Sequence, residues 1–144
     1  MNPILKSLLV FVFLAAAEFA AEDFAEWRKK AETGDANAQF NLGVMYDNGM
    51  GVPKDDAEAA KWYRKAADQG NVWGQYMVGM LYHYGEGVLK DLVQAHVWYN
   101  IAGANGHERA KKNLTSIEKE MTDSQKEKAM DMARELFAKL PKEK

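Results

Sequence analysis

Two stretches of this chain repeat each other and decide its fold: DANAQFNLGVMYDNGMGVPKDDAEAAKWYRKAADQG at residues 35–70 and NVWGQYMVGMLYHYGEGVLKDLVQAHVWYNIAGANG at residues 71–106. Aligned without a gap, they are identical at 13 of 36 positions. The series Gly34, Gly70 and Gly106 keeps the same 36-residue spacing. A period of this length is typical of a helical solenoid, in which each unit is one pair of helices.

The first half of each unit predicts a helix. In residues 36–47 an apolar stripe has helical spacing and is made by Ala38, Leu42 and Met45. Gly43 lies inside this helix, where glycine costs about 1 kcal/mol relative to alanine. We therefore expect another backbone to pass very close to Gly43 and to its equivalent in the second unit, Gly79.

The second half of each unit predicts a turn and a second helix. The turns are NGMGV at 48–52 and YGEGV at 84–88, whose glycines permit the positive φ angles that reverse a chain. Asp55 and Asp91 follow in the position of helix N-caps. The small and aromatic side chains that the second helix should bury are Ala59, Trp62, Tyr63 and Ala66.

Partial units flank the two whole ones. We expect a lone second-type helix at 22–33, a first-type helix at 108–120 and a closing helix at 123–139, where Thr122 and Gln125 have the spacing of a capping box. The resulting array spans 18–120, with a half unit at 22–34, repeats at 35–70 and 71–106, and a half unit at 107–120. Residues 121–144 form the capping helix and tail.

Residues 1–17 have the features of a secretory signal peptide. Lys6 precedes an unbroken apolar run at 8–14, and Ala15 and Ala17 are small residues of the kind that signal peptidase recognises. We expect cleavage before Glu18, which predicts a periplasmic or secreted protein. The alternative is an uncleaved anchor, although the apolar run is shorter than the roughly 20 residues of a membrane-spanning helix. No stable membrane insertion is expected after cleavage.

Composition excludes several kinds of function. The 144 residues carry a formal net charge of −2, so nothing favours binding to nucleic acid through charge alone. The absence of cysteine excludes disulfides, thiolate metal sites and cysteine nucleophiles. His83, His96 and His107 lack the spacing of metal ligands, and we expect three separate surface or groove side chains. No catalytic residue, metal or cofactor is predicted.

The repeated pattern resembles the Sel1-like repeat family, which is similar to tetratricopeptide repeats. The motifs are AxAQxxLGxMY at 36–46, GxGV at 49–52 and DxxxAxxWYxKAA at 55–67, within a match over about 22–116. The resemblance implies an all-α fold, a right-handed solenoid of antiparallel helix pairs. It also implies an adaptor that binds proteins or peptides, often in bacterial envelope or export processes, and not an enzyme.

Comparison of the units predicts a binding groove. First-type helices line the concave face of such a stack, so their positions that differ between units and lie off the core are candidates. The second unit is rich there in Trp, Tyr and Met, which are enriched at interfaces. The predicted groove residues are Asn37, Phe40, Asn41, Val44, Trp73, Tyr76, Met77, Met80, Tyr84, Arg109 and Asn113. The polar members at the rim suit a peptide backbone or a carboxylate.

Two alternatives stay open. In the first, Trp73 and Met77 only pack against neighbouring helices of a short array. In the second, the chain is a cell-envelope enzyme related to peptidoglycan, or a modulator of one, since cysteine-rich relatives have been linked to cell-wall binding. Those relatives carry a cysteine pair in each repeat, which this chain lacks. The oligomeric state is not predicted.

Overall fold

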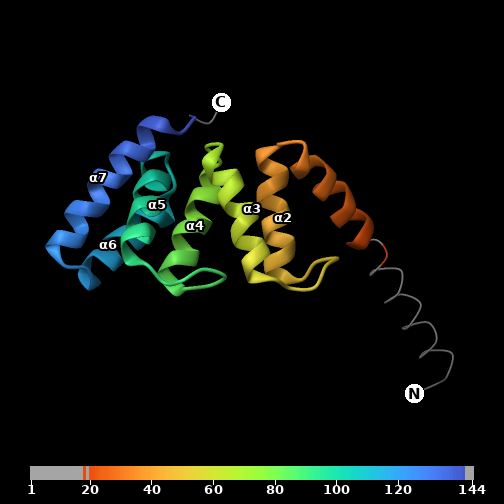
Figure 1. Ribbon diagram of the computed structural model, residues 1–144, viewed down its shortest axis with the longest axis horizontal. Coiled ribbons are helices and arrows are strands. Elements are labelled where there is room, and N and C mark those ends of the chain that lie inside the picture. The colour runs from red at the N-terminus through yellow and green to blue at the C-terminus, as the bar shows by residue number, and fades with distance from the viewer. Residues whose placement is uncertain (1–17, 19, 142–144) are drawn as a thin grey trace, which may run out of the picture.

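The computed structural model describes residue 18 and residues 20–141, and every regular element in this part of the chain is helical (Figure 1). The expected signal peptide, 1–17, lies outside the described residues. A first helix over 20–32 precedes the labelled elements, which are α2 (Ala36–Asn48), α3 (Asp56–Asp68), α4 (Val72–Tyr84), α5 (Leu92–Ala104), α6 (Glu108–Ile117), the short 3-10 helix η1 (Glu118–Glu120) and α7 (Asp123–Lys139).

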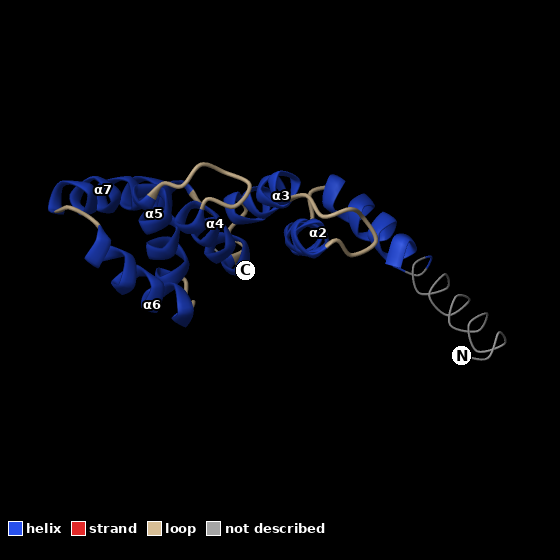
Figure 2. Cartoon of the chain, turned by 90° about the horizontal axis from the view of Figure 1, so that it is seen from below, coloured by secondary structure: helices blue, strands red, loops and turns tan. Residues whose placement is uncertain are grey.

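The helices form a solenoid that runs in a single row from the N-terminus to the C-terminus (Figure 1). α2 pairs with α3 and α4 pairs with α5, while α3 also packs against α4 and joins the two pairs. Seen from below, α3, α5 and α7 lie along one side of the row and α6 projects from the other (Figure 2). The repeat period therefore predicts the helix pairs correctly.

Side-chain caps explain where the paired helices begin. Asp55 and Asp91 accept hydrogen bonds from the backbone N–H groups three residues later, as the sequence predicts. Asp35 and Asn71 do the same at the starts of α2 and α4. These four caps repeat at the period of the sequence, so each helix is started by a local interaction of its own unit.

Two buried tyrosines explain the glycines inside the first helices, and here the prediction of a close backbone was wrong. A Cβ on Gly43 would lie 2.6 Å from Cδ1 of Tyr63, and one on Gly79 would lie 2.5 Å from Cδ1 of Tyr99. Both tyrosine side chains are fully buried in the partner helix of the pair. The glycines therefore make room for an aromatic ring, which fills the space between the paired helices.

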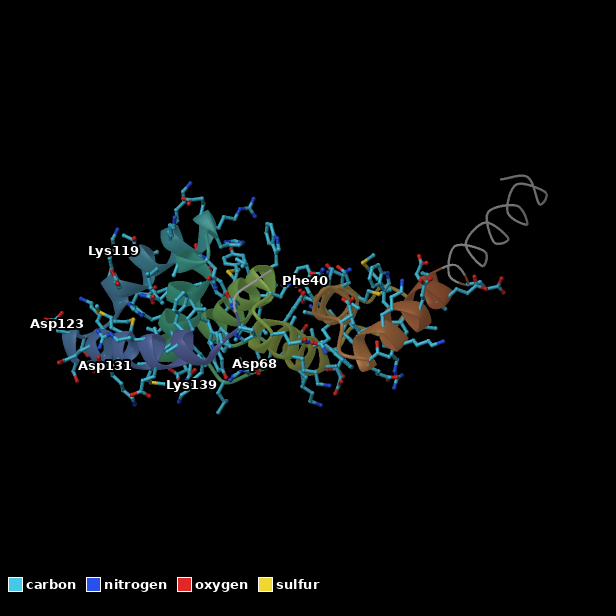
Figure 3. All side chains as sticks on the ribbon, turned by 90° about the horizontal axis from the view of Figure 1, so that it is seen from above. Phe40, Asp68, Lys119, Asp123, Asp131 and Lys139 are labelled. Atoms are coloured by element: carbon cyan, nitrogen blue, oxygen red, sulfur yellow. The ribbon has the colours of Figure 1, made fainter. Side chains whose placement is uncertain are left out.

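The C-terminal end differs in one respect from the expected helix at 108–120. α6 ends at Ile117, and the next three residues form η1 before Thr122 starts α7 with the predicted capping box. α7 packs mainly against α5 through Ala129 and Ala133, which are buried. Its other face is charged, and Figure 3 shows Asp123 and Asp131 at this end of the row. α7 thus closes the array with a polar outer surface.

Candidate functional site

An aromatic cluster joins α4 to the start of α6 on the predicted groove face. The Tyr76 ring stacks on the His107 ring with centroids 4.2 Å apart. Trp73 meets the same imidazole edge-on at 4.7 Å. Trp73 is nevertheless 56% exposed, although large apolar side chains usually bury more of their surface. The cluster therefore holds an exposed indole in a fixed position.

His107 organises this cluster. Its Nδ1 accepts the Ala110 backbone N–H at 3.2 Å and so caps α6, which leaves the proton of the neutral ring on Nε2. His107 is only 7% exposed, and its Nε2 has no partner within the described part of the chain. Burial, with a further contribution from the Arg109 charge, lowers the pKa of His107. The imidazole therefore stays neutral and serves as a stacking surface for Tyr76.

Asn113 connects the same surface to α6. Its Nδ2 lies 3.5 Å from the Tyr76 hydroxyl and 3.4 Å from Sδ of Met80. Arg109, one turn earlier, is exposed and adds a cation beside the cluster. Five predicted groove residues on α4 and α6 are thus brought together, along with one aromatic ring, His107, that the prediction did not include.

The remaining predicted residues are less available. Phe40 lies 5.6 Å from the Tyr63 ring between centroids, and Val44 and Met77 are half-buried against the same core. Asn41 is half-buried in α2. The Asn37 side chain is exposed but accepts a hydrogen bond from Asn71 at 3.0 Å. The α2 part of the groove is therefore mostly engaged within the chain.

Tyr84 extends the exposed aromatic surface to the end of α4. It is 58% exposed and stacks on His83, with ring centroids 4.4 Å apart. His83 Nδ1 lies within hydrogen-bonding distance, 3.2 Å, of the hydroxyl of Tyr99, and burial raises the pKa of this hydroxyl. Trp73 and Tyr84 are thus the two most exposed aromatic side chains of the predicted groove.

The expectation of three surface or groove histidines was wrong for His96, whereas His107 belongs to the groove cluster but is buried within it. His96 is fully buried in α5, where its Nε2 lies 3.0 Å from Oε1 of Glu118. His83 is half-buried and has its Nε2 3.7 Å from Glu120. These carboxylates come from η1, and no short motif links them to the histidines. Among the described residues, no group of three or more such side chains is placed to hold a metal ion.

The 36-residue register does predict that His107 caps a helix. It occupies the same repeat position as Asp35 and Asn71, both of which cap a first-type helix. Asp35 is exposed at this position, whereas Asn71 and His107 are buried, so the register predicts the capping role of His107 and not its burial. The face offers aromatic surface, an amide and a cation, all of which suit the binding of a partner.

No helix in the described ranges is both long enough and apolar enough to cross a membrane.

Comparison with known protein families assigns the chain to one of them. Residues 36–71 and 74–107 match the Sel1 repeat. A Sel1 repeat protein from Oxalobacter formigenes has 47% sequence identity and a TM-score of 0.61, covering 62% of this chain and 68% of its own. The fold is a helical repeat of the protein-interaction class, and the chain belongs to the Sel1 repeat family. This family is generally a non-catalytic fold that binds other proteins.

Two further solved structures are similar. A protective antigen of uropathogenic Escherichia coli strains with an SLR fold has 37% identity and a TM-score of 0.80 over 83% of this chain. This chain spans only 26% of that antigen. The cysteine-rich protein B of Helicobacter pylori has 33% identity and a TM-score of 0.61, with 63% of this chain and 68% of that one covered. A search among curated proteins returned no match.

Proposed function

We propose that this protein is an exported, non-enzymatic adaptor that holds a protein or peptide partner on the face made by α4 and α6. The observation that carries the proposal is the half-exposed Trp73, fixed against the buried His107. Tryptophan at such a position is a frequent energetic centre of protein interfaces. Arg109, close by, adds a charged group that can pair with a carboxylate of the partner.

A pull-down from the native envelope tests the proposal. Trp73→Ala and Arg109→Ala should each lose a partner that the parent chain retains, while circular dichroism shows the helices intact. Leu89→Ala is the matched control, because Leu89 is a 90% exposed apolar side chain on the loop after α4. Retention of the partner by both Trp73→Ala and Arg109→Ala would contradict the proposed site.

The proposed export has a separate test. Sequencing the N-terminus of the protein from its native source should find Glu18 as the first residue. A chain that keeps Met1 in the cytosol would contradict export.

The alternative of a cell-envelope enzyme also stays testable. It requires the purified chain to turn over a peptidoglycan or β-lactam substrate, and such turnover would overturn the adaptor.

A further inference from the structure

At each junction between units, the same two repeat positions face each other. At two of the three junctions, their side chains fill the space between them. At the first junction, Phe24 of helix 20–32 packs edge-on against Tyr46 of α2, with ring centroids 5.5 Å apart. At the third, His96 of α5 hydrogen-bonds to Glu118 at 3.0 Å. The residues of each contact lie 36 residues, one period, before or after the equivalent residues of the middle junction.

The middle junction leaves this space open. Its two positions hold Ala60 on α3 and Tyr82 on α4, and a half-enclosed pocket of about 260 Å³ lies between them. Val78, Leu81 and Val88 are among the apolar residues that line it. An apolar cavity of about 150 Å³ is already large enough to hold benzene, so the space suits one aromatic ring.

Phe24 shows what the pocket accepts, because it occupies the equivalent space. A Cβ built on Gly51 would lie 3.1 Å from Cβ of Phe24, so this glycine borders the phenylalanine. The equivalent glycine, Gly87, lines the open pocket beside Ala60. A phenylalanine side chain therefore fits among these repeat positions at the first junction. The middle junction has alanine, Ala60, in place of that phenylalanine.

Two cations lie at the rim of the pocket. Lys61 and Arg64 project from α3, where Lys61 pairs with Glu58 and Arg64 pairs with Asp68. The Arg64 guanidinium also lies 4.8 Å from the centroid of the Trp98 ring. Exposed pairs at this helical spacing are weak and screened by salt, so they exchange readily for carboxylates of a ligand. The rim therefore favours an acidic segment over a basic or neutral one.

We propose that this pocket binds one aromatic side chain from an acidic segment of a protein partner. The ring lies between Ala60 and Tyr82, and flanking carboxylates of the segment meet Lys61 and Arg64. The pocket uses the face of α4 that carries Val78, Leu81 and Tyr82, away from Trp73. The proposal is therefore independent of the partner site on α4 and α6.

The test is an NMR titration of the full chain with the blocked peptide Glu-Asp-Phe-Ala-Glu, the sequence of residues 22–26. We expect saturable shifts at Leu81 and Val88 and a dissociation constant on the order of 1 mM, as for a single side-chain anchor. The peptide with alanine in place of phenylalanine, and the peptide Lys-Lys-Phe-Ala-Lys, should each bind about tenfold more weakly or worse.

Two sets of variants localise the binding. Ala60→Phe should stay folded, because it fills the pocket as Phe24 fills its own junction, and it should abolish the shifts. Ala104→Phe, at an exposed alanine of α5, is its control and should bind as the parent does. Lys61→Glu combined with Arg64→Glu should weaken binding about tenfold or more, whereas Lys119→Glu should not.

Three results would overturn the proposal. The first is no saturable shift up to about 10 mM peptide, well above the expected constant. The second is a response at the Trp73 indole in place of Leu81 and Val88, which would assign the peptide to the other face. The third is unchanged binding by Ala60→Phe. If Ala60→Phe unfolds, the double variant Lys61→Glu with Arg64→Glu decides between the outcomes. Unchanged peptide binding by that double variant would contradict the proposed site.

Discussion

Gly87 shows how a single residue joins one unit to the next. Its φ is +67°, and a Cβ at this position would lie 2.1 Å from the backbone oxygen of Asp56 on α3. The loop after α4 therefore rests directly on the start of the preceding second helix. Gly106 has a similar positive φ, +95°, but nothing lies within 4 Å of where its Cβ would be.

Replacing these two glycines separates backbone strain from contact. Gly106→Ala should lower the free energy of unfolding by about 1 kcal/mol, the cost of a left-handed alanine. Gly87→Ala should cost about 3 kcal/mol or more, because the loop must also move off Asp56. Urea unfolding followed by circular dichroism measures both. Equal losses would show that the contact at Gly87 contributes nothing.

His107 should make stability depend on pH. Because its pKa is lowered in the folded chain from an ordinary value of 6.5, the unfolded chain binds the proton more readily. The contribution of the neutral His107 to the free energy of unfolding is therefore complete above pH 6.5. It is lost as pH falls through the lowered pKa of His107 in the folded chain. His107→Asn keeps a capping side chain, as Asn71 does at the equivalent position.

Urea unfolding between about pH 7.5 and about pH 5 tests this dependence. The parent should lose more stability over this range than His107→Asn does. His83 and His96 are present in both proteins, so the difference reports position 107 alone. Curves that stay parallel over the whole range would contradict a lowered pKa at His107.

At the scale of an element, α7 covers the C-terminal end of the core. Ala133 is 3% exposed where α7 packs against α5, whereas Ala138 on the same helix is exposed. Ala133→Asp should lower the free energy of unfolding by about 3 kcal/mol, since it buries an unpaired charge. Ala138→Asp should change it by less than about 0.5 kcal/mol. Thermal melts compare the two, and a similar drop in both would argue against the close packing of α7 on α5.

How much the sequence predicts depends on whether the signal repeats. Asp55 and Asp91 recur at one spacing, so their capping role could be predicted from either copy. His96 and Glu118 lie at the repeat positions of Phe24 and Tyr46, so the 36-residue register can predict that the two positions meet. The register cannot predict a hydrogen bond there, because these two residue types occur together at this junction alone among the three.

The candidate surface follows the same rule. The difference between units points to Trp73, and its exposure in the fold agrees with that choice. Phe40 is replaced by a similar ring, Tyr76, in the second unit, and each ring packs against the tyrosine of its own unit, Tyr63 or Tyr99. A position that stays aromatic in both units therefore belongs to the repeated packing, whereas the change from Asn37 to Trp73 marks a position that the repeated packing does not fix.

At the scale of the whole molecule, the row of helices presents two separate surfaces for contact. One carries Trp73 and Tyr84, which are both more than half exposed. The other carries the pocket beside Ala60. The short array limits the area of either side, so one well-fixed anchor should dominate the affinity of each. For the proposed adaptor function, we expect that anchor to be Trp73.

Photo-crosslinking at this anchor tests the account most directly. Benzoylphenylalanine replaces Trp73 in one protein and Phe137 in another, since Phe137 is an aromatic residue, 36% exposed, on α7 and outside the proposed partner site. After irradiation in the native envelope, position 73 should give one discrete adduct that position 137 does not give. Adducts from position 137 alone, or the same adducts from both positions, would contradict a partner site on α4 and α6.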